Sequence, residues 1–175
     1  YFVTATSSNT FTYDVNAPTA TISKPVVDRS RSLALLSGTA VATGPSPVVL
    51  VQVRMQDMGS TGFWNPVTQG GNFDILPADA ETAWFTAKLE TAGWANWSVA
   101  SGTFISGSRY GFMARARNAS GVWQVVNTTQ TTTYDNTPPE TGLSYPAQGQ
   151  ATVNTLPLIS GTLNDLPDPV NPAVR

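Results

Sequence analysis

A passage that occurs twice in this chain constrains its fold more than any other feature. Tyr134 to Pro139 (Tyr-Asp-Asn-Thr-Pro-Pro) has a counterpart at Tyr13 to Pro18, and the two aspartates lie 121 residues apart (135 minus 14). The similarity continues downstream, where Leu35 to Thr39 (Leu-Leu-Ser-Gly-Thr) matches Leu158 to Thr162 (Leu-Ile-Ser-Gly-Thr). Self-similarity at a fixed spacing is the signature of repeated modules. The chain is therefore predicted to be part of an array.

The repeat also predicts the module boundaries. We expect residues 1–13 to form the last strand of a preceding module, residues 14–135 a complete module, and residues 136–175 the first strands of the next. Pro18 fixes its own backbone and biases Ala17 away from helix. Each linker is therefore expected to hold consecutive modules at a preferred angle.

Composition indicates an all-β fold. Charged residues make up only 11% of the chain and hydrophobic residues 41%. Thr, Ser, Val, Ala, Gly and Pro dominate, which suits short strands and turns better than long amphipathic helices. The hydrophobic content also argues against global disorder.

Several classes of function are excluded by residues that are missing. The chain has no histidine and no cysteine, so a Ser-His-Asp triad, a Cys-His pair, thiolate metal sites and disulfides are all impossible. Its carboxylates are scattered over loops, and we expect no enzyme activity. A net charge of −2 gives no basic surface for phosphates, so neither nucleic acid nor an anionic membrane is an expected partner.

Strands are predicted from apolar residues that alternate with polar ones. Thr19 to Ile22 and Leu33 to Ala40 are the first two, and Val48 to Asp57 is the clearest and is expected at the centre of a sheet. Arg109 to Arg117 alternates again, followed by a hairpin loop at Asn118 to Gly121 and a returning strand at Val122 to Tyr134. The residues predicted to face inward are Ala34, Leu36, Gly38, Ala40, Val49, Val51, Val53, Met55, Tyr110, Phe112, Ala114 and Ala116.

The region from Met58 to Gly107 is the least regular. Glycine and proline separate short apolar segments, so several short strands are expected there. These segments are Phe63 to Asn65, Asn72 to Leu76, Trp84 to Leu89 and Trp97 to Ala100.

Together these motifs resemble bacterial immunoglobulin-like repeats. The resemblance rests on Ser37 to Ala40 (Ser-Gly-Thr-Ala), Val51 to Asp57 (Val-x-Val-x-Met-x-Asp), Ile105 to Tyr110 (Ile-x-Gly-x-x-Tyr), Arg115 to Arg117 (Arg-Ala-Arg) and the Asp-x-x-x-Pro linkers. It implies an immunoglobulin-like β-sandwich in a large secreted adhesin or other surface protein. It also implies that the Tyr110 hydroxyl bonds to backbone a few residues upstream. Asn118 replaces the acidic residue that usually follows the Arg-Ala pair, which weakens a calcium site taken from the family.

Calcium is nevertheless one candidate ligand. Asp14 and Asp135 recur at the junctions, where Asp57, Asn136 or backbone carbonyls could join them as oxygen ligands. The alternative is that these aspartates cap turns through local bonds to backbone N–H groups.

Tryptophans are the other candidates for a binding site. Trp84 and Trp97 lie in strand-like segments and are expected to be buried, whereas Trp64 and Trp94 stand beside Gly, Asn and Ala and could be exposed. Exposed rings could stack on sugars or on a partner protein.

The function expected from the sequence is structural. The chain is predicted to be a non-catalytic immunoglobulin-like repeat of an extracellular stalk, adhesin or filament, located outside the cell or at its surface, with neighbouring modules as its partners. The alternative is a ligand-binding adhesin module that recognises a glycan or a host or cell-surface protein through residues 58–107.

Overall fold

The computed structural model describes residues 11, 13–26, 28–68, 72–100, 102–147, 149 and 152–164. The predicted last strand of a preceding module, residues 1–13, thus lies almost wholly outside the described residues. Strands dominate the rest, as the composition predicted, and the protein is all-β. The elements are β1 (Thr19–Lys24), β2 (Arg29–Ser30), β3 (Leu35–Val41), β4 (Val48–Asp57), η1 (Pro77–Ala83), β5 (Phe85–Thr86), β6 (Lys88–Leu89), η2 (Ala92–Trp94), β7 (Trp97–Ala100), β8 (Arg109–Asn118), β9 (Thr128–Tyr134), β10 (Glu140–Tyr145) and β11 (Ser160–Asn164).

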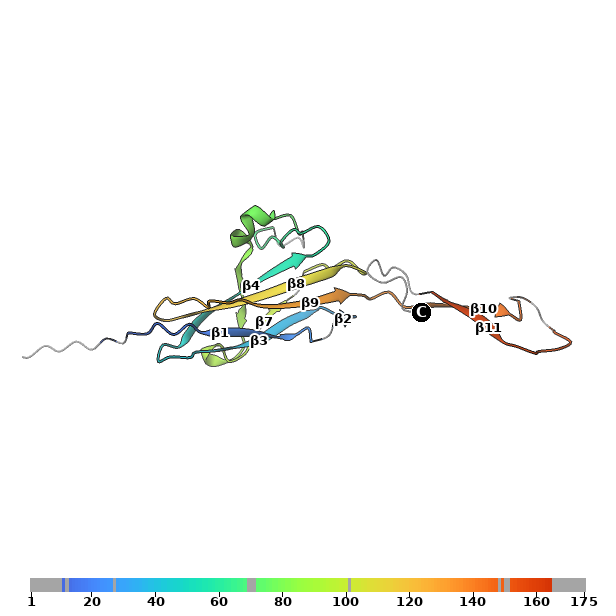
Figure 1. The fold of residues 1–175 in the computed structure, drawn as a ribbon, viewed down its shortest axis with the longest axis horizontal. Coiled ribbons are helices and arrows are strands. Elements are labelled where there is room, and N and C mark those ends of the chain that lie inside the picture. Colours follow the sequence, from blue (N-terminus) through green and yellow to red (C-terminus); the bar gives the residue numbers. More distant parts are fainter. Residues whose placement is uncertain are drawn as a thin grey trace, which may run out of the picture.

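Two sheets pack face to face as a sandwich (Figure 1). One has the strand order β1-β3-β7-β6 and the other β2-β9-β8-β4-β5. A single core fills the space between them, and its buried side chains come from both sheets. The predicted β-sandwich is therefore confirmed.

The alternating pattern of β4 and β8 produces most of this core. Tyr110, Phe112, Ala114 and Ala116 of β8 are all buried, as predicted, and so are Val51, Val53 and Met55 of β4. The prediction for Val49 is wrong. The register between β4 and β8 shifts between Val48 and Leu50, and this irregularity turns Val48 inward and leaves Val49 exposed.

The expected position of β4 needs correction as well. β8 is the central strand of its sheet, with β4 beside it, and β4 pairs on its other side with only two residues of β5. β4 is thus paired on both sides without being the middle of the sheet.

In the opposite sheet, β3 lies under the indole of Trp97. Leu36, Gly38 and Ala40 face inward as predicted, but Ala34 is exposed and precedes the strand. A Cβ atom on Gly38 would collide with the Trp97 ring and with the carbonyl oxygen of Thr21. The glycine of the Ser-Gly-Thr motif therefore makes room for a buried tryptophan.

The region between β4 and β8 is only partly made of strands. Trp84 and Trp97 are buried, as expected, and β5, β6 and β7 fall within the predicted segments. The two segments nearer to β4 form isolated bridges instead of strands, one between Phe63 and Ile75 and one between Phe63 and Gln56 of β4. The 3₁₀ helix η1 was not predicted.

The returning strand begins later than expected. β9 starts at Thr128, and before it the chain pairs with β8 only through a bridge between Trp123 and Arg117 and a bond from the backbone N–H of Gln124 to the carbonyl oxygen of Ala116 at 2.8 Å. The side chain of Gln124 reaches the other sheet. Its Oε1 accepts from the backbone N–H of Ala20 in the opposite sheet at 2.6 Å. The loop of Asn118 to Gly121 is as predicted, and Gly121 has a φ of 87°.

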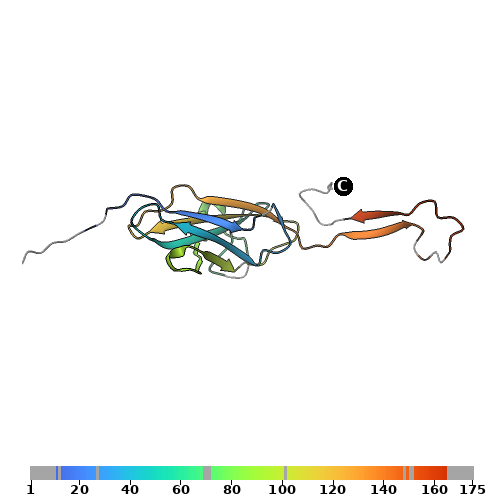
Figure 2. The ribbon, with the colours of Figure 1, turned by 90° about the horizontal axis from the view of Figure 1, so that it is seen from below.

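Beyond β9, the chain forms a second hairpin that repeats the pairing of the first. Ile22 faces Gly38 in the β1-β3 pair, and Leu143 faces Gly161 in the β10-β11 pair. Both pairs have a register shift near the end of the first strand. It falls between Ile22 and Lys24 in β1 and between Leu143 and Tyr145 in β10. The hairpin lies beyond the end of the sandwich in both ribbon views (Figures 1 and 2).

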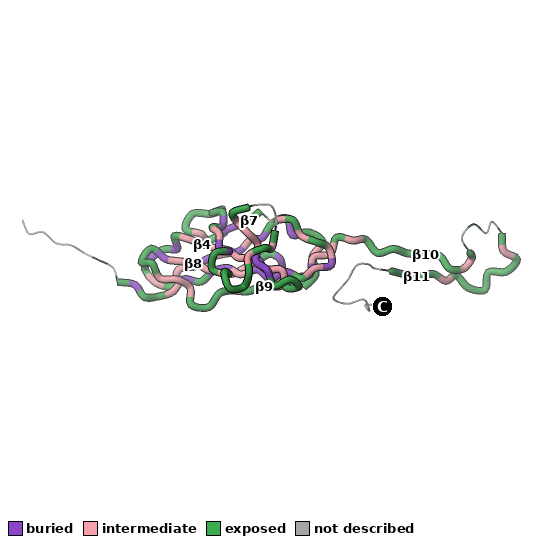
Figure 3. The backbone as a smooth tube through the Cα atoms, turned by 90° about the horizontal axis from the view of Figure 1, so that it is seen from above, coloured by how far each residue is buried: buried purple, intermediate pink, exposed green. Residues whose placement is uncertain are grey.

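The β10-β11 hairpin is mostly exposed, whereas the sandwich contains many buried stretches (Figure 3). Leu36 and Ala40 are in the core, whereas their counterparts Ile159 and Leu163 are 65% and 69% exposed. The β10-β11 hairpin carries apolar residues at the positions that face the core in a sandwich. In the described part of the chain, no second sheet covers them.

Candidate functional site

The two linker aspartates lie at opposite ends of the sandwich. At one end, Asp14 is 5% exposed and accepts from the backbone N–H of Asn16 at 2.9 Å and of Ser46 at 3.0 Å. Its Oδ2 also lies 3.4 Å from the side-chain nitrogen of Asn118. The hydrogen bonds from Asn16 and Ser46, first among them the one from the backbone of Asn16, lower the pKa of Asp14.

At the other end, Asp135 is part of a cluster around the Ser106 hydroxyl. Ser106 Oγ accepts from the backbone N–H of Asn136 at 3.0 Å, donates to Asp135 Oδ1 at 3.3 Å and lies 2.9 Å from Thr137 Oγ1. The backbone N–H of Asp135 donates to Ser30 at 3.0 Å. The start of the linker is therefore fastened to the sandwich that precedes it.

Asp57 caps a turn of its own. Its carboxylate accepts from the backbone N–H of Gly59 at 2.9 Å and from the hydroxyl of Ser60 at 2.8 Å. It ends β4, two strand spacings from β9, and Asp135 lies three residues beyond Thr132, the β9 residue level with Asp57, which places the two aspartates about 14 Å apart. Asp14 lies about 30 Å away, at the far end of the ten-residue strand β8.

These positions bear on the predicted calcium ligands. Oxygen ligands lie about 2.3–2.6 Å from a calcium ion, so Asp14, Asp57 and Asp135 cannot share one. The described residues contain no group of three or more acidic, histidine or cysteine side chains that could hold a metal ion. Each of the three aspartates caps a turn, which is the alternative role considered from the sequence. Calcium binding at a junction stays a prediction.

The tryptophans do not form the exposed platform that the sequence suggested. Trp64 and Trp94 are both half-buried and pack against the core. The Trp64 ring lies 4.8 Å from the ring of Phe85, and its buried indole N–H has no hydrogen-bond partner among the described residues. Trp64 and Trp94 are thus half-buried, which corrects the expectation that both could be exposed.

The outer face of the β4-β8 sheet carries a row of stacked side chains that sequence reasoning missed. Arginines from the strands alternate with aromatic rings from the flanking loops, with distances of 4.2 to 5.3 Å between guanidinium and ring centre. In order along the row, the members are Phe63, Arg54, Trp84, Arg115, Trp123 and Arg117. We call this set the arginine ladder.

Glu81 of η1 joins the middle of the ladder. Its carboxylate lies 2.9 Å from Arg115 and 3.4 Å from Arg54, and it accepts from the indole N–H of Trp84 at 3.2 Å. The bond from Trp84, followed by the effects of Arg115, lowers the pKa of Glu81. The ladder thus fastens η1 and Trp84 to the sheet. The available signal was the outward alternation of Arg54, Arg115 and Arg117.

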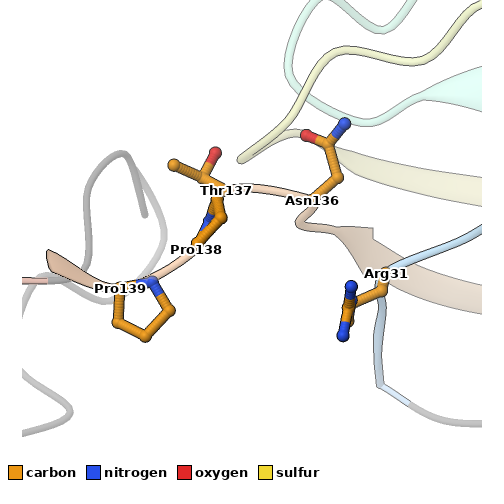
Figure 4. A pocket seen from close by; sticks show the side chains of 5 residues that line it. All are labelled: Arg31, Asn136, Thr137, Pro138 and Pro139. Atoms are coloured by element: carbon orange, nitrogen blue, oxygen red, sulfur yellow. The ribbon is translucent and has the colours of Figure 1, made fainter.

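A shallow hollow lies where the second linker leaves the sandwich (Figure 4). Its lining consists of Arg31, from the segment after β2, and the linker residues Asn136 to Pro139. The guanidinium of Arg31 has no ion partner among the described residues and is exposed. The hollow lies between the linker and the sandwich, and the positively charged side chain of Arg31 is part of its lining.

Comparison with known protein families finds no matching family model, and comparison with curated proteins finds no match. Within the described residues, no helix has the length and apolar character needed to cross a membrane.

Proposed function

We propose that this protein is a structural, non-catalytic repeat of an extracellular stalk, adhesin or filament. One observation carries the proposal, namely that the β10-β11 hairpin repeats the β1-β3 pairing, including its register shift, after a linker of the same Asp-x-x-x-Pro form. The two linkers lie at opposite ends of the sandwich, so successive modules extend the molecule. Such a protein supplies reach and stiffness through repetition.

The fastening of the loops supports a mechanical role. The arginine ladder holds η1 against the sheet, and the Tyr110 hydroxyl accepts from the backbone N–H of Ile105 at 2.9 Å, the bond expected from the family resemblance. Loops that are tied down in this way are poor substrates for proteases, which need locally unfolded chain.

Stretching single molecules of the protein tests the proposal. Residues 14–135 are expected to unfold as one cooperative unit, with a gain in contour length of roughly 40 nm. Labelling of intact producing cells with an antibody against the sandwich tests the location. A chain that extends gradually without a force peak, together with labelling only after cell lysis, would refute the proposal.

The second candidate is recognition of a ligand through residues 58–107. It is favoured by exposed apolar side chains in that region, with Val67 87% and Leu76 66% exposed. Because Trp64 and Trp94 are half-buried, a protein partner fits these side chains better than a sugar ring does. A glycan array and binding to host-surface proteins, with Val67→Ser and Leu76→Ser as variants, separate the two ligand classes.

A further inference from the structure

The two linker aspartates close the same turn with the same oxygen. Asp14 Oδ1 accepts from the backbone N–H of Asn16 at 2.9 Å, and Asp135 Oδ1 accepts from the backbone N–H of Thr137 at 3.1 Å. Asn16 and Thr137 are related by the same 121-residue spacing as the aspartates. The first carboxylate oxygen therefore shapes the linker itself.

The second oxygen differs between the two positions. Asp14 Oδ2 receives the backbone N–H of Ser46, in the β3-β4 loop, at 3.0 Å, and Asn118, at the end of β8, at 3.4 Å. Both donors belong to the sandwich that follows Asp14 in the chain. Asp135 Oδ2 has no hydrogen-bond partner among the described residues, and Asp135 is only half-buried.

Asp135, in turn, is bonded to the sandwich that precedes it. Ser106 donates to its Oδ1 at 3.3 Å, and the hydroxyl of Ser106 also holds the next two linker residues. Asp14 thus shows the contacts of a junction aspartate with the sandwich that follows it. Asp135 shows the contacts with the sandwich that precedes it. Pro18, which follows Asp14, is fully buried, whereas its counterpart Pro139 is exposed.

We propose that each junction aspartate fastens two consecutive sandwiches at once. Its Oδ1 closes the linker turn and binds the serine hydroxyl of the preceding sandwich, while its Oδ2 accepts from the β3-β4 loop of the following one. The partner of the free Oδ2 of Asp135 is therefore a second sandwich of the same kind, beginning with β10. This inference rests on the proposed function, because it requires that sandwiches follow one another.

A joint of this kind fixes the angle between modules. One carboxylate reaches both sandwiches directly, so a change of angle lengthens and weakens at least one of its hydrogen bonds. Arg31 lines the hollow at the same linker and is available to form an ion pair with an acidic group of the next module. The linker then behaves as a short rigid connection between the two modules.

The test uses a two-sandwich protein in which residues 14–175 follow Tyr134 of the same chain. Asp14 then occupies the position of Asp135 between two complete sandwiches, each with its own core within residues 18–135. Since the chain has no cysteine, a cysteine introduced at the exposed Thr129 of each sandwich carries a spin label. The distribution of distances between the two labels reports the freedom of the joint.

We expect one narrow distance distribution. At the junction, Asp14→Asn keeps an oxygen for the turn but presents an N–H₂ group to the loop, so the distribution broadens toward the roughly 10 Å spread of a flexible four-residue linker. Ser106→Ala in the first sandwich broadens it as well. Asp57→Asn, which alters a turn within each sandwich, leaves it unchanged.

Unchanged widths for both junction variants would overturn the inference, as would a broad distribution in the parent protein. Circular dichroism confirms that each variant is folded. The proposed function fails on different measurements, because surface labelling and stretching do not report the width of this distribution.

Discussion

Replacement of Arg115 by lysine tests how strongly the arginine ladder holds the loops to the sandwich. Lysine keeps the charge but loses the flat guanidinium that stacks on rings and donates several bonds at once. Arg115 is stacked on Trp84 at 4.2 Å and on Trp123 at 4.5 Å, and it is bonded to Gln52 and Glu81. Few other substitutions in this chain remove so many contacts while conserving charge.

The expected cost follows from those contacts. Each cation–π contact of a partly exposed arginine contributes about 0.5–1 kcal/mol, and the hydrogen bond to Gln52 about 1 kcal/mol. The pair with Glu81 adds little, since that glutamate side chain is 75% exposed. Lysine retains part of the electrostatic attraction, so we expect Arg115→Lys to lower the free energy of unfolding by about 1–2 kcal/mol.

Urea unfolding followed by tryptophan fluorescence measures this change. Arg109→Lys is the matched control on the same strand, because Arg109 is 44% exposed, pairs with Asp28 at 3.7 Å and donates to the hydroxyl of Thr131 at 3.0 Å. Its expected cost is below about 0.5 kcal/mol. A double-mutant cycle of Arg115→Lys with Trp123→Ala is expected to show a coupling of at least about 0.5 kcal/mol. Equal costs for Arg115→Lys and Arg109→Lys, or a coupling of zero, would refute the reasoning.

Three further predictions concern stability. Tyr110→Phe removes the acceptor of a backbone N–H and is expected to cost about 1–2 kcal/mol in urea unfolding, whereas Tyr134→Phe is expected to cost almost nothing, since the Tyr134 hydroxyl has no partner among the described residues. Gly38→Ala is expected to lower the unfolding temperature, because the new methyl group meets a backbone carbonyl and a buried indole, at a cost of about 1–3 kcal/mol, while Gly59→Ala, whose methyl group has ordinary contacts, is nearly neutral. The lowered pKa of Asp14 means that its carboxylate stabilises the fold above its ordinary pKa of 3.8 and that this stabilisation is lost as the pH falls through the lower, folded-state value. Unfolding curves between pH 2 and pH 6 are expected to show a smaller loss for Asp14→Asn than for the parent, and equal losses would contradict this assignment.

The inner faces of the sandwich were predictable from the sequence. Side chains alternate across a strand with a period of two, so the buried positions of β8 and most of those of β4 can be read from spacing alone. The repeated passages predicted that strands follow the second linker as they follow the first, and β10 and β11 lie there. The Tyr110 bond came from the family resemblance.

The outer face and the ends depended on tertiary contacts. Period-two spacing marks Arg54 and Arg115 only as outward-facing, and what covers them depends on loops distant in sequence that bring Trp84 and Trp123 onto the sheet. The register shift at Val49 is equally invisible in a pattern of valines, because a bulge depends on the partner strand.

The candidate sites divide in the same way. The sequence by itself determined that aspartates recur at the linkers and that an all-β module surrounds them, because turn preferences and strand alternation are local properties. Only the tertiary structure decided that Asp14 reaches Ser46 and that Trp64 and Trp94 turn into the sandwich. Burial and hydrogen bonding between distant residues are set by how the two sheets pack, and no local pattern encodes that packing.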